Sequence, residues 1–188
     1  MKAREGLNHR FAAALLGLLL ALAGGSGGAA DNPEKVIMQL TSTAFTEGAA
    51  IPAKYTCDQA DLSPSLKWTG APAQARSFVL IVDDPDAPVG IWTHWVLYDL
   101  PASVADLSEN QPKTPTLSNG AKQGLNDFRR PGYGGPCPPP GKPHRYFFRL
   151  YALDTLLGLK PGATRKEVES AMAGHALAQC QLMGTYKR

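Results

Sequence analysis

One stretch of the chain gathers acids, prolines, tryptophans and a histidine where two apolar runs meet. It covers residues 83–95 and reads Asp-Asp-Pro-Asp-Ala-Pro-Val-Gly-Ile-Trp-Thr-His-Trp. A turn between two strands needs none of these side chains to reverse direction. Pro85 and Pro88 stiffen the backbone and push the residues before them towards extended conformations. The stretch therefore predicts a rigid loop that presents Asp84 and Asp86 at a binding site, although Asp86 as a residue that merely stabilises the turn is an equal alternative.

A second stretch, residues 131–141, reads Pro-Gly-Tyr-Gly-Gly-Pro-Cys-Pro-Pro-Pro-Gly. This composition excludes a helix and a central strand, so a shaped loop is expected. Glycines allow the backbone to approach a ligand closely, and the prolines form a fixed wall beside them. The N–H groups of Gly134 and Gly135 are candidate donors to an anion.

Two histidines begin predicted strands, His94 after the first stretch and His144 after the second. When protonated, two imidazoles in one cleft can each donate a hydrogen bond to an anion. We expect Asp84 to fix the tautomer of one histidine or to raise its pKa. The alternative for both histidines is an ordinary, satisfied place in the core, and Arg145 and Arg149 are expected on a solvated strand face.

The elements that must position these residues are mostly strands. Periodicity predicts them at residues 36–40, 66–68, 77–82, 94–100, 144–153 and 176–186. The run 77–82 lacks polar alternation, which is typical of a strand buried on both faces. Alternation along the next strand is expected to place His94, Val96 and Tyr98 on one face.

One clear helix is predicted at residues 164–173, where Thr164 and Glu167 have the spacing of a capping box. Residues 102–130 show little periodicity and are expected to form a long surface excursion with few hydrogen bonds of its own. The fold class is therefore mainly β: an antiparallel β-sandwich with one or two short helices in the C-terminal half.

The first thirty residues have the pattern of a secretory signal peptide. Lys2, Arg4 and Arg10 precede an apolar run at residues 11–23, and small residues follow at 24–30. The run is shorter than the ~20 residues that span a bilayer, so an uncleaved anchor is the weaker interpretation.

Cleavage after Ala30, or alternatively after Ala23, would release one domain at residues 31–188 with no integral membrane span. We therefore expect an exported protein, periplasmic or secreted. Losing residues 1–30 removes three basic residues and one acidic residue from totals of 19 and 16, which lowers the net charge from +3 to +1. No nucleic-acid partner is predicted from this balance.

The chain has three cysteines, Cys57, Cys137 and Cys180. Export permits a disulfide, and Cys57 and Cys137 both lie in turn-rich segments, so we predict that they pair and that Cys180 stays free. Three buried or free thiols are the alternative. No Cys-x-x-Cys spacing indicates a zinc or redox site, and no cofactor or metal is predicted.

Four short motifs stand in a fixed order along the chain: Asp84-Pro-Asp-Ala-Pro88, Trp92-Thr-His94, Gly134-Gly135-Pro136 and His144-Arg145-Tyr146. Together they resemble the phosphatidylethanolamine-binding protein family. The resemblance is closest to its bacterial Raf-kinase-inhibitor-like branch, which shares the loop Tyr55-Thr-Cys57-Asp58 with Ser63-Pro64, the run 132–139, and the ending Gly174-His175 to Gly184-Thr185-Tyr186. It covers roughly residues 36–188.

The resemblance implies a β-sandwich with a small anion pocket that accepts phosphate-like groups. The residues that match its wall are Asp84, Asp86, Trp92, His94, Gly135, Pro136, His144 and Tyr146. The implied partner is a small anionic or phosphorylated ligand, with a phospholipid headgroup as one candidate, and regulation of a protein partner is a further implication. Binding to a mammalian kinase is not carried over, because the chain stops soon after Tyr186 and lacks the C-terminal helix of the eukaryotic members.

The preferred hypothesis is therefore an exported, non-enzymatic binding protein with no catalytic residues. A hydrolase that uses Asp84, His94 and His144, with or without a metal, is the alternative. Against it, the chain contains no Gly-x-Ser-x-Gly and no His-Glu-x-x-His motif. A protease or kinase inhibitor that acts through the excursion at 102–130 is a third reading, which rests on family analogy alone.

Overall fold

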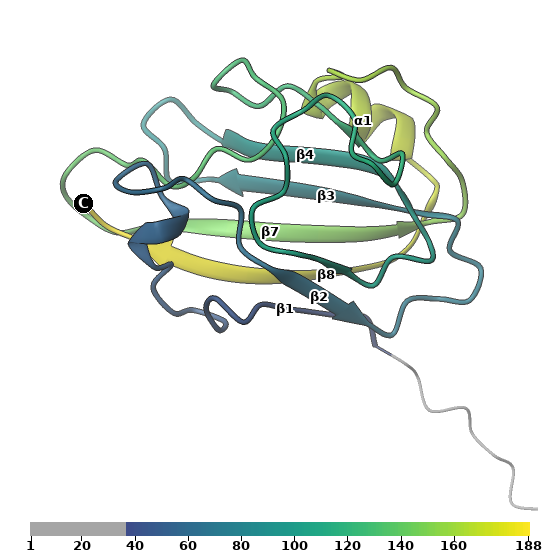
Figure 1. The fold of residues 1–188 in the computed structure, drawn as a ribbon, viewed down its shortest axis with the longest axis horizontal. Helices are drawn as coiled ribbons and strands as arrows, with labels where there is room; N and C mark the ends of the chain where they lie inside the picture. The colour runs from purple at the N-terminus through teal and green to yellow at the C-terminus, as the bar shows by residue number, and fades with distance from the viewer. Residues whose placement is uncertain (1–36) are drawn as a thin grey trace, which may run out of the picture. The chain divides into compact units, whose positions relative to one another are not determined.

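The computed structural model describes residues 37–188, which form two antiparallel β-sheets and one α-helix (Figure 1). The smaller sheet has the order β1 (Gln39–Thr41), β2 (Leu66–Thr69) and β5 (Asp106–Leu107). The larger has the order β6 (Lys122–Gln123), β4 (Trp92–Pro101), β3 (Ser77–Asp84), β7 (His144–Leu153) and β8 (Ala176–Tyr186). A single 3-10 turn, η1 (Ala53–Tyr55), and the helix α1 (Arg165–Met172) complete the described elements.

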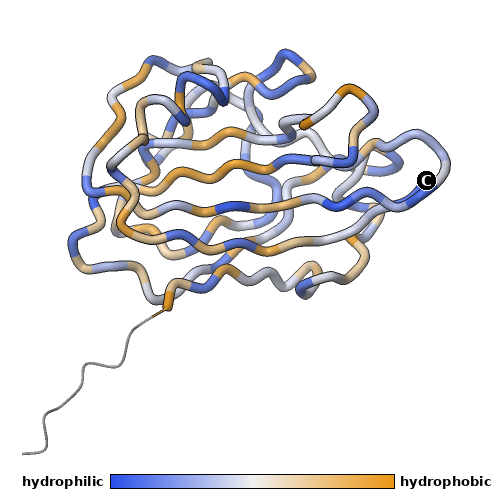
Figure 2. Tube along the Cα trace, turned by 180° about the vertical axis from the view of Figure 1, so that it is seen from behind, coloured by the Kyte–Doolittle hydropathy of each residue, from blue (hydrophilic) through white to orange (hydrophobic). Residues whose placement is uncertain are grey.

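The two sheets share one core, so the predicted sandwich is confirmed. Every residue of β3 is buried, and its side chains alternate between two clusters. Phe78 and Leu80 join the cluster between the sheets, where they meet residues of the small sheet such as Trp68. Val79 and Ile81 join the second cluster, on the outer face of the large sheet. Burial on both faces explains why the run has no polar alternation, and the apolar stretches accordingly cross the middle of the sheet in Figure 2.

The helix α1 covers that outer face through Val168 and Met172, which are both buried. The predicted capping box is present. The Thr164 hydroxyl accepts from the Glu167 N–H at 3.3 Å, and the Glu167 carboxylate accepts from the Thr164 N–H at 2.7 Å. These contacts satisfy two of the free N–H groups at the start of the helix and fix where it begins.

The excursion at residues 102–130 is more ordered than expected. It contains β5 and β6, and Gln123 within it is fully buried. The Gln123 amide donates to the carbonyls of Pro112 and Thr114 at 2.7 Å each and accepts from the Trp95 indole at 2.6 Å. The prediction of few hydrogen bonds was wrong. The Gln123 side chain bonds to backbone groups of the excursion that would be paired between strands in a regular sheet.

The predicted signal peptide at residues 1–30 lies outside the described residues, as does Val36, and the first strand begins at Gln39. Within residues 37–188, no helix combines the length and the apolarity needed to cross a bilayer.

Candidate functional site

A cavity of about 260 Å³ lies at the end of the large sheet where the predicted site residues meet. Its walls are Asp84, Ala87, Pro88, Val89, Trp92, His94, Phe128, Cys137, Pro138, Pro139 and His144. A wider groove of about 740 Å³ lies beside it and shares Val89 and Trp92. That groove contains neither histidine, so the smaller cavity is the candidate site.

Sheet topology explains why residues far apart in sequence meet here. β3 ends at Asp84, and its neighbours β4 and β7 begin at Trp92 and His144. Both neighbours run antiparallel to β3, so their first residues lie beside its last ones. The 85–91 loop that joins β3 to β4 then supplies one wall of the cavity.

A β-bulge aims His94 into the cavity. Val82 pairs with Trp95 and Asp83 with Thr93, which leaves His94 without an opposing residue. Its ring therefore packs edge-on against Tyr146, with ring centres 5.2 Å apart, on the side of the core between the sheets. The expected shared face with Val96 and Tyr98 was wrong, because those residues lie under the helix in the second cluster.

His94 is held in a buried, aromatic setting, with 3% of its surface exposed. Its Nδ1 lies 2.6 Å from the carbonyl oxygen of Gly134, and Phe128 packs edge-on at 5.5 Å between ring centres. Burial lowers the pKa of His94, although the Gly134 carbonyl and the charge of Asp84 act in the opposite direction. At neutral pH the ring is therefore neutral, which differs from the imidazolium expected from the sequence.

Asp84 orients the second histidine, as the sequence suggested for one of the two. The Nδ1 of His144 lies 2.7 Å from Asp84 Oδ2, and both side chains are buried. Asp84 Oδ1 accepts the N–H of Asp86 at 2.8 Å, which closes a turn at the start of the loop. Asp84, rather than Asp86, is thus the residue that stabilises the turn.

Asp86 is paired with Arg145 and is not part of the cavity wall. Its carboxylate accepts two guanidinium hydrogen bonds, at 2.7 and 2.8 Å, and the Arg145 N–H at 2.9 Å. The hydrogen bonds from Arg145 lower the pKa of Asp86 to about 2. This pair ties the loop to the start of β7 from outside the site.

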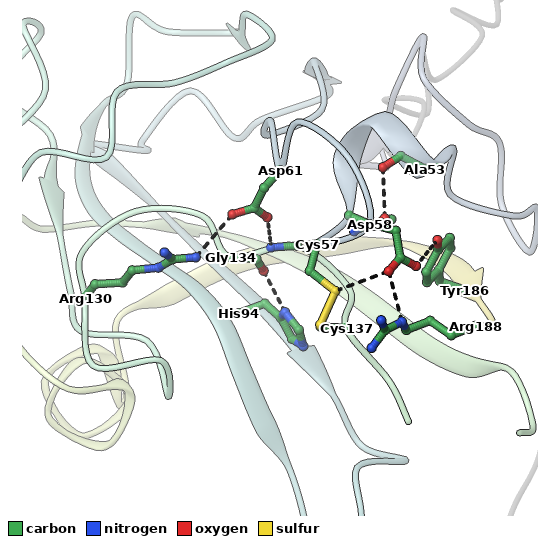
Figure 3. Close-up of a disulfide and its surroundings, with 12 residues drawn as sticks. Ala53, Cys57, Asp58, Asp61, His94, Arg130, Gly134, Cys137, Tyr186 and Arg188 are labelled. Carbon is green, nitrogen blue, oxygen red and sulfur yellow. Dashed lines mark hydrogen bonds and ion pairs between the residues drawn. A yellow bond between two sulfur atoms is a disulfide. The ribbon is translucent and has the colours of Figure 1, made fainter. Parts of the chain in front are cut away.

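The loop at residues 131–141 shapes the cavity wall, but its Gly134 and Gly135 N–H groups are not free to bind a ligand. Figure 3 shows Gly134 between His94 and Asp61. The Gly134 N–H donates to the His94 carbonyl at 2.9 Å, and the Gly135 N–H donates to Asp61 at 2.6 Å. The expectation that these groups donate to a ligand was wrong, because both are already used. A Cβ at Gly135 would lie 2.3 Å from the Tyr55 carbonyl oxygen, so this position requires glycine.

The predicted disulfide is present between Cys57 and Cys137, with 5.4 Å between their Cα atoms (Figure 3). It joins two segments 80 residues apart and places Cys137 in the cavity wall. The Cys57 N–H also donates to the Pro136 carbonyl at 3.1 Å, so Pro136 supports the wall from behind. Cys180 is free, as predicted, and burial raises its pKa to about 11.

Tyr146 lies directly behind His94 and is 1% exposed. Its hydroxyl makes no hydrogen bond to any of the described residues. Burial raises the pKa of Tyr146, and the negative charge of Asp84 raises it further. The phenol therefore keeps its proton at neutral pH, and its ring packs against His94.

Four of the eight predicted residues line the cavity: Asp84, Trp92, His94 and His144. The other four are not among the wall residues: Asp86, Gly135, Pro136 and Tyr146. Sequence reasoning missed Phe128, whose ring packs against both Trp92 and His94. An isolated aromatic residue in an otherwise polar segment was the available signal.

The described wall limits the candidate nucleophiles to the carboxylate of Asp84 and the imidazoles of His94 and His144. It contains no serine or threonine, and its cysteine is in the disulfide. Within residues 37–188, no three His, Cys, Asp or Glu side chains are gathered as metal ligands.

Known proteins are similar to this chain in sequence and in fold. The family model for phosphatidylethanolamine-binding protein matches residues 41–187. A UPF0098 protein of Aquifex aeolicus is 54% identical over 154 residues, which are 81% of this chain and 90% of that protein.

Two crystal structures align with the described fold. A phosphatidylethanolamine-binding protein homologue of Chlamydia trachomatis is 43% identical with a TM-score of 0.75, over 81% of this chain and 99% of that one. YbcL of E. coli, described as a member of the mammalian family, is 33% identical with a TM-score of 0.76, over 80% and 98% of the two chains. On this sequence and structural similarity, the chain belongs to the phosphatidylethanolamine-binding protein family.

Proposed function

We propose that this protein is an exported binding protein that holds a small phosphate-like group in the cavity and does not turn it over. The observation that carries the proposal is the buried Asp84–His144 pair, in which Asp84 holds Nδ1 of an imidazole that lines the cavity. A protonated His144 keeps its Nδ1–H on Asp84 and can donate its Nε2–H to an oxyanion.

The shape of the site supports a small headgroup rather than a large ligand. A cavity of about 260 Å³ lies below the ~300–1,000 Å³ range of drug-sized pockets. Trp92, Phe128, Pro138 and Pro139 give it apolar walls, which weaken competition from water for a bound polar group. The neighbouring groove offers room for the rest of a larger phosphorylated molecule.

Export is supported by two features of the chain. The pattern of residues 1–30 is that of a signal peptide, and the Cys57–Cys137 disulfide suits an oxidising compartment. Sequencing the N-terminus of the native protein from fractionated cells tests this part. A mature N-terminus near Asp31 in the exported fraction is expected, and an intact Met1 in the cytosolic fraction would contradict export.

Backbone amide NMR with three ligands tests the binding site. Inorganic phosphate, phosphoethanolamine and vesicles that contain phosphatidylethanolamine separate free phosphate from a lipid headgroup as the source of the group. Shifts confined to residues 84–94, Phe128 and residues 137–144 are expected with at least one of them. Shifts elsewhere, or no response to all three, would contradict the assignment of the cavity.

Turnover separates the binding protein from the hydrolase. We expect no release of phosphate from p-nitrophenyl phosphate or phosphoethanolamine by the wild type. Hydrolysis that is lost in Asp84→Asn, in a variant that remains folded, would instead establish the alternative.

A further inference from the structure

The backbone fixes where the proton of His94 resides. A carbonyl oxygen can only accept, so the 2.6 Å contact with Gly134 places the proton on Nδ1. A neutral ring then carries a lone pair on Nε2. Among the described residues no group donates to this atom, and the ring lines the cavity. His94 therefore presents an acceptor to a ligand.

The groups that face His94 leave it in this neutral state. Asp83 and Asp84, at the end of β3, carry charges that favour protonation. Tyr146 and His144 face it from β7, and the remaining neighbours are uncharged: the ring of Phe128 and the backbone carbonyls of Gly134 and Gly135. Burial among these groups outweighs the two carboxylates and lowers the pKa of His94.

The cavity wall contains no lysine or arginine to compensate for these acceptors. The Arg145 guanidinium is held by Asp86, and the Arg130 guanidinium, 5.5 Å from the centre of the Phe128 ring, is held by Asp61. His144 is thus the one side chain of the described wall that can bring a positive charge. A fully deprotonated oxyanion would be repelled by the lone pair of His94 and the carboxylate of Asp84. Only His144 in the described wall could donate a charged hydrogen bond to it.

We infer that the cavity selects a ligand that carries its own proton, namely a monoprotonated phosphate monoester. The hydroxyl of this ligand donates to Nε2 of His94. The unprotonated oxygens of the same group accept the Nε2–H of His144. This inference rests on the proposed function and narrows it to one protonation state. His94 then determines specificity, because it rejects oxyanions of the same shape that have no hydroxyl.

Methyl phosphate and methyl sulfate form a matched pair of probes. At pH 5.5 both are predominantly monoanions of similar shape, since the second pKa of a phosphate monoester is about 6. Only the phosphate carries a hydroxyl. Calorimetry at this pH should show methyl sulfate binding about 10- to 100-fold more weakly, the cost of an unpaired acceptor facing an oxyanion. Equal affinities would overturn the inference and leave the proposed function in place.

His94→Gln provides the complementary test, because a glutamine amide can rotate to donate its N–H to either ligand. The two affinities should then converge to within about threefold. An unchanged preference for methyl phosphate in a folded variant would show that another group selects the proton.

Imidazole nitrogen shifts in the wild-type complex give a readout that needs no variant. Nε2 of His94 should remain unprotonated when methyl phosphate is bound. A His94 imidazolium in the complex would overturn the inference, because the ring would then donate. Failure of both probes to bind between pH 5.5 and 8 would contradict the proposed function, and the inference would fall with it.

Discussion

Two Asp–His pairs of nearly equal geometry lie in different surroundings. His144 and Asp84 are 2.7 Å apart, with 11% and 5% of their side chains exposed. His175 and Asp154 are 2.8 Å apart, with 46% of each side chain exposed. Water competes for the hydrogen bonds of the exposed pair, whereas the buried His144 and Asp84 have little access to water and depend on each other as hydrogen-bond partners. The two pairs therefore make the same contact, and only burial beside a cavity makes His144–Asp84 a candidate for ligand binding.

The placement of the two pairs follows from the ends of the strands. His175 comes just before β8 and reaches back to Asp154, just after β7, at the opposite end of the large sheet from the cavity. No described cavity includes either residue. The distal pair is thus a natural internal control for every variant of the buried one.

The largest expected difference between the pairs is in stability. Asp84→Ala leaves the His144 N–H and the Asp86 N–H without their acceptor, so we expect a loss of about 3–5 kcal/mol in the free energy of unfolding. Asp154→Ala should cost less than about 1 kcal/mol, as is usual for exposed pairs. Urea denaturation of both variants measures this. Comparable losses would show that burial does not distinguish the two pairs.

The next effect is a pH dependence that arises from His94. Its pKa is lowered in the folded state, so below about pH 6.5 the unfolded chain binds a proton that the folded protein does not. Stability without ligand should therefore fall as pH decreases from about 6.5 towards the folded pKa, by up to about 1.4 kcal/mol per pH unit. His94→Gln should remove this slope, and His175→Gln should leave it intact. A slope unchanged in His94→Gln would assign it to another group.

The smallest effect is expected at the Asp86–Arg145 pair, whose side chains are 29% and 53% exposed. Asp86→Asn should lower stability by less than about 1 kcal/mol at pH 7. The depressed pKa of Asp86 means that its contribution is present above pH ~4 and disappears towards pH 2. Affinity for phosphoethanolamine should change less than about twofold. A loss of affinity comparable to that of His144→Ala would show that Asp86 contributes to ligand binding.

Much of the scaffold was predictable because it depends on local patterns. The run of β3 and the capping box of α1 carry their signals within a few residues, and the loops that hold Cys57 and Cys137 are rich in turn residues. The positions of His144 at the start of β7 and of His94 near the start of β4 were equally local signals.

The details that define the chemistry depend on tertiary pairing. The bulge that turns His94 towards Tyr146 exists only because Val82 and Asp83 pair with Trp95 and Thr93. Likewise, the proton on Nδ1 of His94 follows from the Gly134 carbonyl, 40 residues away. No spacing in the sequence predicts such contacts, and for that reason a donor was expected where the structure presents an acceptor.

The most direct test of the account compares His144→Ala with His175→Ala by calorimetry with phosphoethanolamine. Loss of the hydrogen bond from His144 to the charged phosphate should weaken binding by about 1.5–3 kcal/mol, or roughly 10- to 150-fold. Loss of the exposed histidine should leave the affinity unchanged. Equal affinities in the wild type and both variants would place the ligand elsewhere and contradict the assignment of the buried pair.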